Sequence, residues 1–421
     1  MAALVILRGR VSSLAATLCL CVPASAATPP VVEDPAALVA RIQPAVEELR
    51  GMKFKRPVTV KTVTPAEARA HFMARAAADW PAERVRLDQK VYEQLGLVPA
   101  GFDLLGSVLD VLEEQALGYY DPGSDVFSAV EGAASSSLAP ILVAHELTHA
   151  FDDQYFDLDA LLGAAQSDDD RAAAAAAVVE GSGTAVMTLF MVREIGAGRL
   201  SVAAVQDMQR SEAARAERLK AAPPVIQRGL LASYVLGMSF LFRGDASGML
   251  LGIPAADFDR AFRDPPRSTE QILHAEKYWD VTRRDTPTPP TPSDLSRTLG
   301  PGWSLVGSGS LGELVLATMA GTAALDMGSP DAVLPARWTN TAAAGTAGDV
   351  YQHYASGSRS ATVLTTRWET EKDAAEFQDG LRSVPRSRSY RASTAVVILG
   401  GDDLGAAAPG VAAIALQAAF Q

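Results

Sequence analysis

The chain has 421 residues, a formal net charge of −12 at pH 7 and two cysteines. This length accommodates two or three domains with substantial cores. The acidic balance and the lack of a basic run in the sequence argue against a nucleic-acid-binding protein.

The N-terminus has the pattern of a secretory signal peptide. Arg8 and Arg10 form a positive start, residues 11–22 are apolar, and residues 24–26 read Ala-Ser-Ala, which is typical of a cleavage site. We therefore predict that residues 1–27 are a signal peptide and that the protein is exported, to the periplasm or the extracellular space.

Cleavage of the signal peptide would remove both cysteines from the mature chain. Cys19 and Cys21 both lie in the predicted signal, so the mature chain would have neither disulfides nor thiol catalysis. No later apolar run is expected to span a membrane, and residues 230–242, the nearest in length, are read as a buried core helix.

The first elements follow from cap residues and periodicity. Asp34-Pro35 and Thr64-Pro65 each place a capping side chain before a proline, as at helix starts. We predict helices over 34–50, 64–78, 81–95 and 101–115, and a strand over 55–63.

Two β-prone runs, 116–120 and 125–130, flank a Pro-Gly turn and predict a hairpin. Because it immediately precedes the most distinctive helix of the chain, this hairpin could pair with an extended peptide by β-augmentation. The candidate substrate-binding residues are then Tyr119, Tyr120, Val126 and Phe127. An ordinary hairpin without a binding role explains the same pattern equally well.

The distinctive helix contains His145-Glu146-Leu-Thr-His149 after an apolar run. Two histidines four residues apart lie on one helical face, so both imidazoles can reach one metal ion. Zinc accepts such ligands and leaves a position open, and Glu146 is placed to act as a general base on water. The pattern therefore predicts a zinc site at which Glu146 activates a metal-bound water.

A third ligand is needed, and Glu180 is the best candidate. It follows Val178-Val179 within a helical pattern, where a carboxylate needs a partner, and Gly181 and Gly183 would permit close helix packing. Asp152, Asp153 and Asp157 are rivals. Asp153 lies one turn beyond His149, so for it we predict a supporting role that orients an imidazole.

The remaining chain is divided by a proline-rich stretch, 286–292, which we take as a linker. Before it we expect an acidic surface loop at 157–170 and helices at 171–194, 202–221, 224–243 and 255–262. After it we expect strands at 349–354, 360–368 and 390–399, and helices at 370–382 and 404–421.

The helix at 145–154, with Glu180-Gly181 downstream, resembles the gluzincin metallopeptidases, the thermolysin-like clan. More narrowly it is similar to exported bacterial gluzincin-like proteins that carry a later Tyr-x-x-Gly-x-x-Phe helix, here 234–240. The similarity covers roughly residues 35–280. The chain departs from the thermolysin pattern in the longer spacing before Glu180 and in Thr184, where an aspartate often supports an imidazole.

The resemblance implies the gluzincin mechanism, in which zinc and Glu146 activate a water that attacks a peptide bond of a peptide or protein substrate. A donor beside the metal then stabilises the oxyanion. Tyr234 and His274 are candidates for this donor, although each could equally be structural.

We therefore predict an α+β protein. A mainly helical zincin-like metallopeptidase domain with a small sheet or hairpin would occupy residues 28–285, and a small α+β domain of unknown role residues 293–421. Two alternatives stay open. One is a catalytically silent scaffold stapled by zinc that serves as a cell-envelope binding protein. The other is an interaction protein that binds through residues 293–421. The sequence does not specify the oligomeric state.

Overall fold

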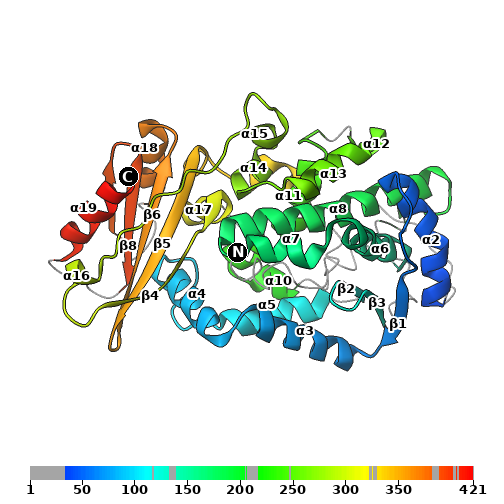
Figure 1. Cartoon of the computed structure of the whole chain (residues 1–421), viewed down its shortest axis with the longest axis horizontal. Helices are drawn as coiled ribbons and strands as arrows, with labels where there is room; N and C mark the ends of the chain where they lie inside the picture. The colour runs from blue at the N-terminus through cyan, green and yellow to red at the C-terminus, as the bar shows by residue number, and fades with distance from the viewer. Residues whose placement is uncertain are drawn as a thin grey trace.

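The computed structural model describes residues 34–115, 118–131, 139–203, 205, 217–245, 248–321, 325, 330–381, 388–401, 404 and 407–420. The predicted signal peptide, residues 1–27, lies outside these residues, as does most of the helix predicted at 202–221. The predicted α+β class is confirmed, because many helices surround two separate sheets (Figure 1).

The N-terminal two thirds of the chain is mainly helical. Its helices are α2 (Pro35–Arg50), α3 (Pro65–Asp79), α4 (Ala82–Gln94), α5 (Leu104–Gln115), α6 (Ala139–Phe156), α7 (Leu158–Ala165), α8 (Asp169–Gly196), α10 (Glu217–Ala221), α11 (Pro224–Leu241), α12 (Gly248–Leu251), α13 (Ala255–Arg263), α14 (Thr269–Leu273) and α15 (Glu276–Trp279). The predicted caps Asp34 and Thr64 accept hydrogen bonds from Ala37 N and Glu67 N. Both helices therefore begin where the sequence indicates.

A three-stranded sheet lies beside α6. Strands β1 (Thr59–Val63), β2 (Gly118–Asp121) and β3 (Val126–Val130) have the order β1-β3-β2, with β1 parallel and β2 antiparallel to β3. The predicted hairpin is confirmed as β2–β3. The central position of β3 leaves β2 as the edge strand next to α6.

The C-terminal part is built on a five-stranded antiparallel sheet, at the left of Figure 1. Its strands are β4 (Ser304–Gly309), β5 (Thr346–Ser356), β6 (Arg359–Trp368), β7 (Arg388–Ala392) and β8 (Ala395–Gly401), in the order β4-β5-β6-β8-β7. Its helices are α16 (Ser296–Leu299), α17 (Gly312–Met319), α18 (Glu371–Gly380) and α19 (Ala408–Ala418), with short 3₁₀ turns at Pro330–Val333 and Pro335–Arg337.

Alternating side chains give this sheet two buried faces. Leu364, Val396 and Ile398 join a core that includes Phe377 of α18, whereas Val363 and Val397 join a second core with α16 and α19. The first of these cores extends without interruption to Leu38 in α2. The predicted linker also contacts the C-terminal sheet, because Thr288 N donates to Ala347 O of β5 at 2.7 Å. The division at 286–292 stays a prediction, but the two parts share one hydrophobic core.

Helix α8 runs through the middle of the helical part and packs on α6 and α11. By length and composition it is the one helix in the described part of the chain that could cross a membrane, although 72% of its most apolar window is buried inside the protein. Residues 169–196, and not 230–242, are thus the stretch nearest to transmembrane length, whereas the expectation that no later run spans a membrane stays a prediction. The buried alanines and valines of a core helix meet the same criterion.

The crossing of α8 and α11 depends on two glycines. A Cβ at Gly181 would overlap the backbone of Gly237, and one at Gly237 would overlap the carbonyl of Ala177. The small residues let the two backbones touch, which confirms the close approach predicted for Gly181.

We expect Gly181→Ala to destabilise the fold by about 1–3 kcal/mol, as overpacking of a tight interior does. Gly196→Ala is the matched control, since a Cβ at this last residue of the same helix meets nothing within 4 Å. Urea unfolding of the two variants would measure the difference. Equal midpoints would mean that the helices separate easily at this crossing.

Two local predictions are wrong. Residues 157–170 are not a loop, because Asp157 caps α7 through Ala160 N and the leucines 158, 161 and 162 pack inward. The single strand predicted at 390–399 is the hairpin β7–β8, which turns at Ser393 with a φ of 47°. Strand β4 and helix α17 were not predicted from the sequence.

Candidate metal centre

Helix α6 carries the two histidines into the interior. His145, Glu146 and His149 are 0, 1 and 2% exposed. Further along the helix, the amide of Gln154 accepts from Lys55 N at 2.8 Å and Arg56 N at 3.1 Å and donates to Arg56 O at 3.0 Å. The C-terminal half of α6 is therefore held to the segment that leads into β1.

Three donor atoms converge, as predicted. The Nε2 atoms of His145 and His149 are 2.9 Å apart, and Oε2 of Glu180 lies 3.3 and 3.5 Å from them. Ligands held at 2.0–2.1 Å around a tetrahedral zinc ion are about 3.3 Å from one another. Shifts of a few tenths of an ångström would therefore let all three atoms bind one ion, and the donor set fits zinc.

Glu180 occupies this position because α8 presents it toward α6. Its side chain is 14% exposed. Burial alone would raise its pKa, but the two imidazoles and their hydrogen bonds outweigh burial and lower the pKa to about 2. Glu180 is therefore held as a carboxylate, the form that binds metal.

Gly183 makes room for one of the ligands. A Cβ at this position would lie 2.7–2.9 Å from Cε1, Nε2 and Nδ1 of His145. Only a residue without a side chain lets the imidazole lie against α8. The role predicted for Gly183 is confirmed, and its contact is with the metal-binding ring itself.

Glu146, the predicted base, faces the edge strand β2. Its Oε2 accepts a hydrogen bond of 2.8 Å from Tyr120 N of β2. This backbone N–H points away from β3 and fixes the orientation of the carboxylate beside the histidines.

The predicted substrate-binding hairpin needs a correction. Val126 and Phe127 lie in β3, whose backbone is paired on both sides, with β1 and with β2, so they cannot receive a peptide strand. Of the two hairpin strands only β2 lies at an edge of the sheet, and the role of Tyr119 and Tyr120 there stays a prediction. Their side chains are 2% exposed. Tyr119 stacks on His71, so His71 has a packing role.

The role predicted for Asp153 is also wrong. Its carboxylate accepts from the Tyr120 hydroxyl at 2.8 Å and from Leu158 N at 2.9 Å, so it secures the hairpin and the start of α7. Among the described residues, no hydrogen-bond partner reaches Nδ1 of His145 or of His149. Asp157, one of the rival ligands, caps α7.

The neighbouring Asp152, named only as a rival ligand, is the residue that sequence reasoning undervalued. It is fully buried and accepts from Arg50 of α2 and from Ser182 Oγ of α8 at 2.6 Å. Arg50 is 102 positions away in the chain. No spacing rule could have linked these residues, although a charge inside an apolar helix is a general signal of a buried partner.

The two donor candidates lie in different surroundings. The ring of Tyr234 is stacked 6.0 Å from that of His145. His274 instead pairs with the buried Glu313 of α17 at 3.0 Å, and this partner raises the pKa of His274 even though burial opposes it. The structure therefore brings Tyr234 to the site and gives His274 a different partner.

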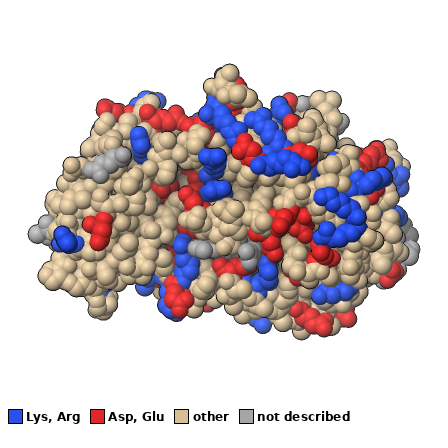
Figure 2. Space-filling view, in the orientation of Figure 1, with Lys and Arg blue, Asp and Glu red and all other residues tan. Residues whose placement is uncertain are grey.

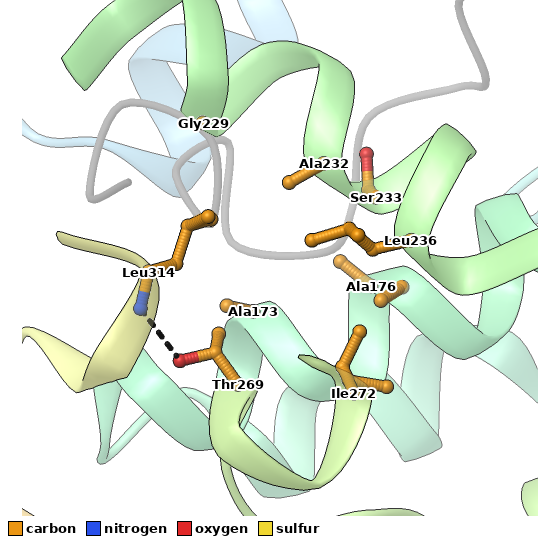
Figure 3. A pocket seen from close by; sticks show the side chains of 10 residues that line it. Ala173, Ala176, Gly229, Ala232, Ser233, Leu236, Thr269, Ile272 and Leu314 are labelled. Carbon is orange, nitrogen blue, oxygen red and sulfur yellow. Dashed lines mark hydrogen bonds between the residues drawn. The ribbon is translucent and has the colours of Figure 1, made fainter. Parts of the chain in front are cut away.

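A small pocket lies along the same helix as Glu180, between α8, α11, α14 and α17 (Figure 3). Its wall includes Ala173, Ala176 and Ala177, and Ala176 precedes Glu180 by four residues, on the same face. Thr269 accepts a hydrogen bond of 3.4 Å from Leu314 N at the rim. The hydroxyl also donates to Asp170 at 2.5 Å. Apart from Thr269 and Ser233, the residues that line the pocket have no polar side chain.

Comparison with known proteins yields one match. A family model described as a domain of unknown function (DUF8575) matches residues 303–408, which cover β4 to the start of α19. No curated protein and no solved structure matches the chain. The match lies wholly outside α6 and α8, and it does not include the three converging donors.

Proposed function

We propose that this protein is an exported zinc-dependent peptidase. The observation that carries the proposal is the convergence of His145, His149 and Glu180 on one point, with Glu146 between the two histidines on the same helix. A site that only staples helices together does not require a carboxylate in that position.

Each residue of the site would have its own role in hydrolysis. His145, His149 and Glu180 would hold zinc, which when bound makes water more acidic and polarises a carbonyl group. Glu146, oriented by Tyr120 N, would take a proton from the attacking water and pass it to the leaving amine. Tyr234 is the candidate donor to the developing oxyanion, since it lies beside His145.

A peptide or protein is the substrate class that suits the surroundings of the site. The edge strand β2 lies directly beside α6 and could align an extended chain by backbone hydrogen bonds. On the face shown in Figure 2, acidic and basic side chains lie next to one another, and basic side chains gather toward the upper part of the view.

One observation favours a second candidate, a zinc ion that stabilises the fold without catalysis. The side chains of His145, Glu146 and His149 are almost fully buried, and a metal enclosed by protein ligands is typical of a structural site. The same residues would then tie α6 to α8 in a scaffold that acts by binding.

The test is hydrolysis of unfolded β-casein by the mature chain and by its Glu146→Gln variant. We expect equal zinc content in both and a loss of cleavage by about 100-fold or more in the variant, because the general base is removed. Glu83→Gln, an exposed and equally conservative change in α4, is the matched control and should cleave normally.

The outcomes separate the two candidates. Equal zinc content without cleavage by either protein would support the structural ion. Equal cleavage by wild type and Glu146→Gln would contradict the assigned base.

A further inference from the structure

We infer that Asp152 is a positioning residue that, together with Arg50 and Ser182, sets the spacing of the two ligand-bearing helices and so the zinc affinity of the site. This inference rests on the proposed metal site. It assigns a role to a buried polar cluster that lies outside the three donor atoms.

The cluster lies within one helical turn of the ligands on both helices. Asp152 follows His149 by three residues on α6, and Ser182 follows Glu180 by two on α8. The hydrogen bond of 2.6 Å from Ser182 Oγ to Asp152 Oδ2 therefore joins α6 to α8 immediately beside the point where their donors meet.

Arg50 holds the aspartate from the opposite side. Its Nε and Nη2 donate to Asp152 Oδ1 at 3.0 and 2.5 Å. The guanidinium in turn packs 3.9 Å from the ring centroid of Phe258 in α13. Because Arg50 is the last residue of α2, the carboxylate is fixed by contacts from α2 and α8 and has little freedom to rotate.

Stability alone is a poor explanation for this cluster. Arg50, Asp152 and Ser182 are all 0% exposed. Removing an ion pair from water carries a desolvation free energy that cancels much of the attraction between the two charges. Apolar side chains of similar volume often stabilise a core at least as well. Hydrogen bonds of fixed length and direction, in contrast, define how far apart two helices lie.

The experiment measures zinc affinity by chelator competition and stability of the metal-free protein by urea unfolding, in the same set of full-length mature variants. Ser182→Ala should weaken zinc binding by about 10- to 100-fold, the range for loss of an outer partner of a metal ligand. Thr188→Val is the matched control, because its hydroxyl bonds within α8 and to Met238, away from α6. Its affinity should be unchanged.

Replacing Arg50 and Asp152 together distinguishes an effect on the position of the ligands from an effect on the stability of the fold. In Arg50→Met with Asp152→Leu, apolar groups fill the same space, so we expect the urea midpoint to stay near that of the wild type while zinc affinity falls as in Ser182→Ala. If this double variant fails to fold, the zinc affinity and stability of Ser182→Ala alone test the positioning role.

The failure of this inference differs from failure of the proposed function. Wild-type zinc affinity in Ser182→Ala, with normal binding by the parent, would overturn the positioning role and leave the metal site intact. A fall in affinity that is matched by an equal loss of stability would make the cluster merely structural and also overturn it. A parent chain that binds no zinc would overturn both.

Discussion

Deletion of residues 293–421 is expected to leave a chain that does not fold. The largest hydrophobic core contains residues from both sides of the proline-rich stretch, for example Leu38 and Val178 together with Leu314, Trp338 and Ile398. A polar contact also joins the two sides of this stretch, since Arg84 of α4 donates to the hydroxyl of Tyr351 in β5. Truncation would expose this apolar surface to water at a cost of about 25 cal/mol per Å².

Circular dichroism and urea unfolding of residues 28–292 would test this expectation. We predict no cooperative transition for the fragment alone. Co-expression with residues 293–421 as a separate chain is the control, and it should restore a folded complex by completing the shared core. A sharp unfolding transition of the 28–292 fragment by itself would show that it is an independent domain.

Replacement of Glu180 by alanine is expected to lower zinc affinity by more than about 100-fold, since loss of a direct ligand should exceed the cost of losing an outer partner. Two imidazoles would remain, and no other carboxylate among the described residues forms a three-donor group with them. Competition with a chromophoric chelator measures the change.

Glu194→Ala is the matched control for this variant. It removes a glutamate from the same helix, where Glu194 pairs with Arg199 near the C-terminal end, and zinc affinity should not change. If Glu180→Ala binds zinc as tightly as the wild type, Glu180 is not a zinc ligand and the third ligand is a different residue.

The candidate site could be predicted in its main features because its signals are local. His145 and His149 share a face by helical spacing, and the charge of Glu180 within an apolar helix indicated a buried partner. The structure confirms that these three residues come together. The identity of the metal and the reaction stay predictions.

What escaped prediction depends on contacts between distant segments. The pair of Arg50 with Asp152, and the parallel pairing of β1 with β3 that removed Val126 and Phe127 from the sheet edge, both join residues far apart in the sequence. Local rules could not choose between Asp152 and Asp153 as the residue near the ligands, because both lie within about one turn of His149. Their partners on α2, α8 and β2 make the difference.

The secondary structure, too, was predicted well only where its signals in the sequence are clear. Helices with caps, such as α2 and α3, were located closely from sequence, whereas α7 was mistaken for a loop because its acidic residues outweighed three leucines. The turn at Ser393 was overlooked because it contains neither glycine nor proline, the residues that usually signal a reversal.

The most direct test of the central claim is zinc titration of the metal-free mature chain, followed by native mass spectrometry. The arrangement of His145, His149 and Glu180 predicts one zinc ion per chain, and none bound at the same concentration in His149→Ala. Absence of zinc from the wild type, or equal uptake by the variant, would contradict the metal centre from which the proposed function follows.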